Sequence, residues 1–230
     1  RQRDKTGLFA VEGVKLCEEL LKESLEITAV FCTERAEVKN PALTRALYEA
    51  SAETYSVTEE VYGKLTEEQN PEGIFAVAKK PRVSTDPQNT EGTGGFLILD
   101  DLQNPQNLGT VIRTASALGI SRILLGKGCA DPFGKKALRA SMGTIFKIHL
   151  CLSNDLCAAL PLLKKSGTVY AAALDEKAKD VRTVRFLPED HLVIGNEGRG
   201  ISDAVLSLCD EKVIIPMKQN TESLNAAAAA

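Results

Sequence analysis

Short apolar segments alternate with helix-like segments through the second half of the sequence, and this alternation limits the possible folds more than any other feature. Strands that are apolar along their whole length and separated by helices are typical of a parallel sheet that helices cover on both faces. We therefore expect an α/β domain built on a parallel sheet. Its candidate strands are residues 96–100, 122–125, 145–150, 168–174, 192–195 and 213–215.

A polar segment, residues 84–95, precedes this pattern. It reads STDPQNTEGTGG and contains no hydrophobic side chain, only turn-forming and polar residues. Such a composition is typical of a linker and is not expected to pack into a core. We interpret the chain as an N-terminal domain, residues 1–83, a linker, residues 84–95, and a C-terminal domain, residues 96–230.

The N-terminal domain has a mixed pattern that indicates a small α/β module. Apolar residues recur at helical spacing over residues 11–21, and Thr58 is expected to cap a helix that follows it. β-branched and apolar runs indicate strands between the helices. The expected helices are residues 11–21, 41–50 and 58–65, and the expected strands are residues 27–32, 54–57 and 74–78.

Composition argues against several classes of protein. The six cysteines form no C-x-x-C pair, and the two histidines have no zinc-ligand spacing, so we expect reduced thiols and no metal. The apolar runs are far shorter than the ~20 residues that cross a bilayer. We expect a cytoplasmic protein that binds no membrane.

Charge is balanced over the chain but not locally. The net charge of −3 gives no overall sign of nucleic-acid binding. Residues 122–147, however, carry six basic side chains against Asp131 alone, a net charge of +5. This stretch is either a phosphate-binding surface or a solvated helix face.

The first candidate functional segment follows the strand at residues 96–100. Asn107 is placed to cap the next helix, and the side chain of Arg113 is expected to lean back over Gly109, which has no side chain to block it. A cation would then lie at the carboxyl end of a strand, where open α/β sheets bind ligands. Taken alone, a cap and a surface ion pair explain the two residues more simply.

The second segment is a glycine-rich loop after the strand at residues 192–195. Gly195, Gly198 and Gly200 let a ligand approach bare backbone, but their spacing is not the dinucleotide-binding G-x-G-x-x-G. Glu197 either holds an arginine or is an ordinary turn acid. The missing G-x-G-x-x-G also argues against a nucleotide-dependent oxidoreductase.

The third segment begins where the last strand meets Pro216 and ends in Ser223, Leu224 and Asn225. Alone, this Ser-x-Asn would be interpreted as a helix cap. No G-x-S-x-G elbow surrounds Ser223, so the pattern gives no support to a serine hydrolase. The five alanines that follow, residues 226–230, carry no weight.

Together these segments resemble the SpoU/TrmH branch of the SPOUT class of RNA methyltransferases, which methylates ribose 2′-hydroxyl groups with S-adenosylmethionine. N-x-G-x-x-x-R stands at residues 107–113, G-x-E-x-x-G at 195–200 and P-M…S-L-N at 216–225. Residues 136–143, KALRASMG, look like a further segment of this branch. Residues 9–13, FAVEG, resemble the start of its N-terminal substrate-binding domain.

The resemblance implies more than the pattern of residues does. It implies a parallel sheet with a deep trefoil knot, preceded by a ribosomal-protein-like RNA-binding domain, in a homodimer. It implies that large-subunit rRNA is the substrate, with tRNA methylation or a noncatalytic role in ribosome assembly as alternatives. The cofactor would be held by the backbone of Gly195, Ile215 and Leu224. The catalytic group would be Asn107, Arg113, Glu197, Ser223 and Asn225, with Glu197 and Asn107 holding Arg113 against the target phosphate and ribose.

Overall fold

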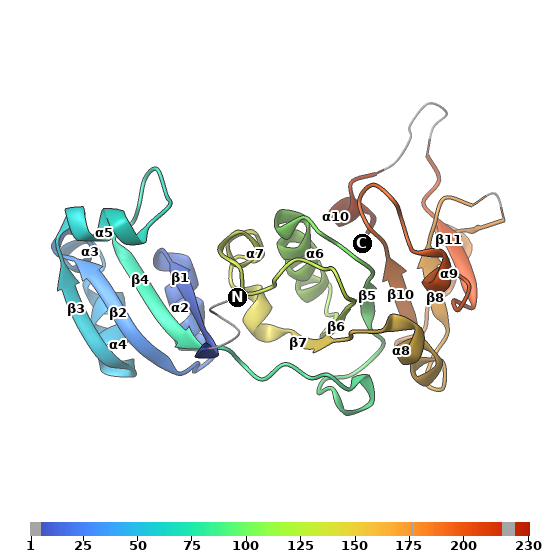
Figure 1. Cartoon of the computed structure of the whole chain (residues 1–230), viewed down its shortest axis with the longest axis horizontal. Coiled ribbons are helices and arrows are strands. Elements are labelled where there is room, and N and C mark those ends of the chain that lie inside the picture. The colour runs from blue at the N-terminus through green and yellow to red at the C-terminus, as the bar shows by residue number, and fades with distance from the viewer. Residues whose placement is uncertain (1–5, 176, 218–223) are drawn as a thin grey trace.

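The computed structural model describes residues 6–175, 177–217 and 224–230, which form two sheets side by side along the long axis of the molecule (Figure 1). Helices α6 (Pro105–Ala117) and α7 (Lys135–Ser141) lie between the two sheets. No helix in these ranges is long and apolar enough to cross a membrane.

The first sheet has four strands in the order β1-β4-β2-β3, with β4 antiparallel to both β1 and β2. Thr58 caps α5 as predicted, because its hydroxyl oxygen accepts the N–H of Val61 at 3.3 Å. The prediction of a helix from residue 11 was wrong at its start, because residues up to Glu12 form an edge strand and Gly13, with φ of 94°, turns the chain into the helix. The elements are β1 (Leu8–Glu12), α2 (Val14–Lys22), β2 (Ile27–Thr33), α3 (Glu34–Lys39), α4 (Pro41–Ala50), β3 (Ser51–Val57), α5 (Glu59–Leu65) and β4 (Ile74–Lys79).

The second sheet confirms the predicted parallel α/β architecture. Its seven strands, in the order β7-β6-β5-β10-β8-β11-β9, are all parallel. The trefoil knot stays a prediction. The elements besides α6 and α7 are β5 (Leu97–Leu99), β6 (Arg122–Leu125), β7 (His149–Leu152), α8 (Leu156–Leu163), β8 (Val169–Ala172), β9 (Lys179–Asp180), β10 (His191–Ile194), α9 (Asp203–Leu206), β11 (Glu211–Ile214) and α10 (Ala226–Ala229).

One predicted strand, residues 145–150, begins instead as a 3-10 helix. Residues 145–150 were expected to be extended, but Thr144–Lys147 form a 3-10 helix and the strand begins at His149. The preceding residues Met142 and Gly143 both have left-handed backbone conformations, with φ of 52° and 82°. The chain therefore turns sharply after α7, and the apolar run enters the core as a helical turn.

Helices cover both faces of the parallel sheet, as expected. Apolar side chains of α6, α7 and α10 pack with Leu97, Leu99 and Ile123 on one face, and those of α8 and α9 pack with Ile98 and Leu124 on the other. At Gly109 a Cβ atom would collide with the backbone of Ala137 and Ser141. The glycine is therefore explained by the close approach of α7 to α6, and not by space for Arg113.

The segment at residues 84–95 is not the fully solvated linker that its composition predicts. Pro87 is buried in a short 3-10 helix, Pro87–Asn89, and Thr90 is buried beside it. The backbone of Ser84 exchanges hydrogen bonds with Leu150 and Leu152 along the edge strand β7. Proline and the threonine methyl group supply enough apolar surface to dock the segment.

Buried contacts join the two sheets into one body. The ring of Phe9 on β1 packs against Phe133 and Phe146, at centroid distances of 5.4 and 5.7 Å. Beside them Glu19, only 4% exposed, pairs with lysines of its own helix and, across the boundary, with Lys147 at 3.2 Å. Hydrogen bonds from these lysines lower the pKa of the Glu19 carboxyl to about 2. The first domain is therefore docked on the second rather than loosely tethered.

Candidate active site

The neighbouring parallel strands β5 and β10 end at the same edge of the sheet, and polar residues follow both of them. Asp100 and Asp101 follow β5, and the glycine-rich loop follows β10. The side chain of Asn196 donates to the carbonyl of Asp101 at 2.8 Å, and the carboxylate of Asp100 accepts the N–H and hydroxyl of Ser202, both at 2.8 Å. These contacts clamp the loop at both ends. Sequence reasoning missed the roles of all four residues, although two acids at a strand end were visible.

Gly195 is required by the way this loop closes. Asn196 and Gly200 exchange two backbone hydrogen bonds of 2.9 Å, which brings the loop back over the end of β10. A Cβ atom at residue 195 would overlap the backbone of Gly200 and Ile201. Only a glycine fits here without moving the main chain.

Glu197 anchors the start of α6. One carboxylate oxygen accepts the N–H of Asn104 at 2.9 Å and the side-chain amide of Asn107 at 3.1 Å, and the other accepts the N–H of Gln103 at 3.3 Å. Burial alone would raise the pKa of the Glu197 carboxyl, but these N–H donors lower it below its usual value. The group therefore stays ionised, with both oxygens engaged.

Asn107 connects Glu197 to Asn225, the residue that caps the last helix, α10. It was expected to cap α6, but Asn104 is the cap, accepting the N–H groups of Gln106 and Asn107. A carboxylate can only accept, so Glu197 fixes the NH₂ group of Asn107 toward itself and leaves the amide oxygen to face Asn225. Asn225 donates to that oxygen at 3.2 Å and caps α10 with its own oxygen. The structure thus brings Glu197, Asn107 and Asn225 into one hydrogen-bonded chain.

Arg113 is not part of the hydrogen-bonded chain of Glu197, Asn107 and Asn225. Its side chain is exposed and forms no hydrogen bond or ion pair with any residue that the structure describes. The expectation that Glu197 and Asn107 hold Arg113 was therefore wrong. Successive residues of an α-helix are ~100° apart around its axis, so Arg113, which follows Asn107 by six residues, lies about 120° around α6 from it. In addition, the backbone N–H groups of Gln103 and Asn104 already bind the carboxylate of Glu197. Ser223 lies outside the described residues.

A cavity of about 610 Å³ opens beside the glycine-rich loop. The three residues predicted to hold a cofactor, Gly195, Ile215 and Leu224, all line it. Glu197 lies on the same wall, while Leu174 and Ile201 supply apolar surface. A mainly apolar cavity of this size suits a small organic cofactor.

Comparison with known proteins gives matches to both halves of the chain. Residues 95–230 match the SpoU rRNA Methylase family, and residues 1–76 match the MRM3-like substrate binding domain. A relative from Bacillus subtilis, the 23S rRNA (guanosine(2553)-2′-O)-methyltransferase RlmP, is 33% identical over 234 residues, which cover 100% of this chain and 88% of that protein.

Solved structures agree with the sequence comparison. An AdoMet-bound rRNA methyltransferase from Sinorhizobium meliloti superposes with a TM-score of 0.85 at 28% identity, covering 99% of this chain and 85% of that one. The SpoU methyltransferase AviRb from Streptomyces viridochromogenes, in complex with AdoMet, has a TM-score of 0.84 at 25% identity and coverages of 99% and 88%.

Proposed function

This chain belongs to the SpoU rRNA methylase family, and we propose that it transfers a methyl group from S-adenosylmethionine to a ribose 2′-hydroxyl of large-subunit rRNA. The observation that carries this proposal is the cavity lined by Gly195, Ile215 and Leu224, next to the hydrogen-bonded chain of Glu197, Asn107 and Asn225. The name of the Bacillus subtilis relative and the AdoMet-bound structures support the same reaction.

S-adenosylmethionine supplies a methyl group attached to a positively charged sulfur. We propose that the backbone of Gly195, Ile215 and Leu224 holds it, because all three residues line the cavity. The apolar side chains of the lining, among them Leu174 and Ile201, would pack against the cofactor.

The roles of the polar residues follow from their partners. Glu197 cannot serve as the base that accepts the 2′-hydroxyl proton, since donors occupy its oxygens and its pKa is lowered. We assign it to positioning Asn107, which with Asn225 orients the ribose. Arg113, exposed on α6, would bind the target phosphate and stabilise the negative charge that develops on the attacking oxygen. Such positioning supplies much of the rate of a direct transfer. The new carbon–oxygen bond would form as the methyl–sulfur bond breaks, and the hydroxyl proton would pass to solvent water.

The proposal is tested by incubating the full chain with tritium-labelled S-adenosylmethionine and either large-subunit rRNA or tRNA, each lacking native modification. We expect label in the rRNA. Label only in tRNA would assign the alternative substrate. Label in neither RNA, with cofactor binding shown by calorimetry, would favour the noncatalytic role in ribosome assembly.

Two further properties belong to this proposal. We propose a homodimer, as the family resemblance implies, and sedimentation of the purified protein tests it. We also propose that the protein acts in the cytoplasm and needs no metal, so that chelators should leave methyl transfer unchanged.

Replacing Gly195 with alanine should weaken cofactor binding and destabilise the protein. The new methyl group would overlap the backbone of Gly200 and Ile201, so the loop must move. We expect cofactor affinity to fall about 10-fold or more and stability to fall by ~2 kcal/mol, in the range for overpacked sites. Calorimetric titration and thermal melting measure the two effects.

Gly63→Ala provides the control, because Gly63 lies on α5 in the first domain and does not line the cavity. A Cβ atom at residue 63 would meet no atom within 4 Å. Its cofactor affinity should stay within a few-fold of the wild type. Equal affinities for the two variants would show that the closure of the loop on Gly195 does not matter for binding.

A further inference from the structure

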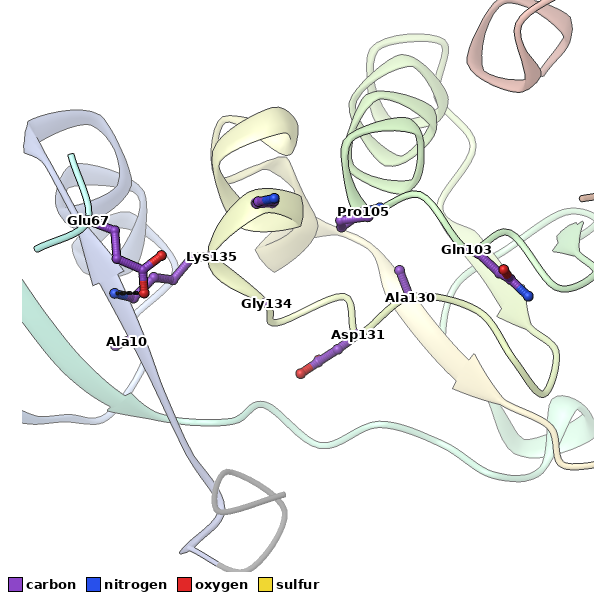
Figure 2. Close-up of a pocket in the computed structure, with 9 residues that line it drawn as sticks. Ala10, Glu67, Gln103, Pro105, Ala130, Asp131, Gly134 and Lys135 are labelled. Atoms are coloured by element: carbon purple, nitrogen blue, oxygen red, sulfur yellow. Dashed lines mark hydrogen bonds and ion pairs between the residues drawn. The ribbon is translucent and has the colours of Figure 1, made fainter. Parts of the chain in front are cut away.

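A second cavity, of about 570 Å³, lies in the cleft between the two domains (Figure 2). Ala10 and Glu67 come from the first domain, while Gln103, Lys135 and Lys136 come from the second. The cleft borders the candidate active site, because the N–H of Gln103 on its wall donates to the carboxylate of Glu197. A ligand in the cleft would therefore lie next to the hydrogen-bonded chain of Glu197, Asn107 and Asn225.

Lys135 and Lys136 of α7 line this cleft, and Arg139 lies one turn further along the same helix. Carboxylates of the first domain pair with Lys135 and Arg139. Lys135 pairs with Glu67 at 3.2 Å, the contact drawn in Figure 2, and Arg139 pairs with Glu68. Lys136 lines the cleft with no hydrogen bond or ion pair to the described parts of the chain. The remaining carboxylate on the wall, Asp131, accepts the N–H of Phe133. Three of the six cations of the basic stretch, Lys135, Arg139 and Lys147, are thus paired with carboxylates of the first domain.

These two pairs differ from the buried contacts that join the domains. Glu19 is almost fully buried, whereas each of these two pairs has one exposed partner: Glu67 is 76% exposed against 31% for Lys135, and Arg139 is 53% exposed against 30% for Glu68. Ion pairs that are open to solvent on one side are weaker than fully buried ones. The docking of the domains rests on Phe9 and Glu19, so the carboxylates of Glu67 and Glu68 can leave the cations without separating the domains.

We propose that the cleft binds the phosphate backbone of the RNA substrate and that Glu67 and Glu68 occupy its cations until RNA phosphates displace them. The proposal rests on the proposed function, since it takes RNA as the substrate. A phosphate bound by Lys135 and Arg139 forms charge-assisted hydrogen bonds like those of the carboxylates it replaces, and the release of counterions from RNA adds to the exchange. The two carboxylates would then disfavour weak, nonspecific polyanions.

The test measures the affinity of the full chain for a fluorescently labelled RNA hairpin of mixed sequence, without cofactor, over a range of salt concentrations. Glu67→Gln/Glu68→Gln should bind about 3- to 10-fold more tightly than the wild type, because its cations need not be released first. Lys135→Gln/Arg139→Gln should bind about 10-fold more weakly, and the slope of log K against log salt should fall by about 1.4, as for two lost phosphate contacts.

The matched control is Glu23→Gln/Glu60→Gln, which removes the same charge from the same domain. Glu23 pairs with Lys147 beside the buried contacts and Glu60 pairs with Lys64 on the first domain's surface, both away from the cleft. This variant should bind RNA within about 2-fold of the wild type, since distant charges are screened. If Glu67→Gln/Glu68→Gln binds no more tightly than this control, the carboxylates serve only the interface and the proposal is wrong.

Failure of the proposed function would look different. The binding measurement uses no cofactor, so a wild type that binds RNA but transfers no methyl group counts against the methyltransferase proposal alone. Normal methyl transfer with an unchanged salt slope in Lys135→Gln/Arg139→Gln counts against the cleft alone.

Discussion

An RNA substrate with a single 2′-deoxy substitution at the target nucleotide should bind this protein with nearly normal affinity and accept no methyl group. Affinity for RNA comes mostly from phosphates and shape, which the substitution leaves in place. The accepting oxygen, in contrast, is gone. The expected loss of transfer is complete, because the residues that we assign to the site, Asn107, Arg113 and Asn225, would be arranged around an atom that the substrate lacks.

The measurement is tritium transfer from labelled S-adenosylmethionine into matched ribo and 2′-deoxy substrates, with binding followed in parallel at one salt concentration. A base methyltransferase would label both RNAs almost equally, since its acceptor atom is unchanged. That result would overturn the 2′-O assignment and leave the fold and the family intact. Loss of binding along with transfer would instead mean that the hydroxyl contributes to recognition.

Local signals explain which elements the sequence predicts well. Proline in the first turn and helical periodicity marked α4, which runs from Pro41 to Ala50 as expected, and the apolar run at residues 122–125 coincides with β6. Thr58 was recognisable as a cap because a threonine before a helical pattern has a specific local role. The strand β1 was missed because its apolar residues run, with only Glu12 and Gly13 between, into the apolar positions of the amphipathic helix α2.

The candidate site was predictable in its members but not in its contacts. The family motifs named Glu197 and Asn107, which are 90 residues apart and hydrogen-bonded in the structure. The other partners of Glu197 are the backbone N–H groups of Gln103 and Asn104. Backbone donors have no signature in the residue types, so the sequence favoured Arg113 as the partner of the carboxylate. Only the positions of β5 and β10 as neighbours in the sheet reveal the actual arrangement.

Replacing Arg113 with lysine should remove nearly all methyl transfer while cofactor affinity stays within a few-fold. Lysine keeps the positive charge but loses the planar fork that binds a phosphate through two hydrogen bonds, and it places its charge at a different point. We expect kcat/KM to fall by about 100-fold or more, the size of effect seen when a preorganised donor to a developing oxyanion is removed. Cofactor affinity should be preserved because Arg113 does not line the cavity beside Gly195.

Arg182→Lys is the matched control for this variant, because Arg182 is also an exposed arginine of the second domain and is held by Asp180 rather than left for a ligand. Its kcat/KM should stay close to that of the wild type. Stability should change little in either variant, since the exposed Arg113 side chain forms no hydrogen bond or ion pair with the described residues and Arg182 loses only an exposed pair. An Arg113→Lys enzyme with substantial activity would mean that a charge alone suffices at this position. The phosphate and oxyanion role would then belong to another residue.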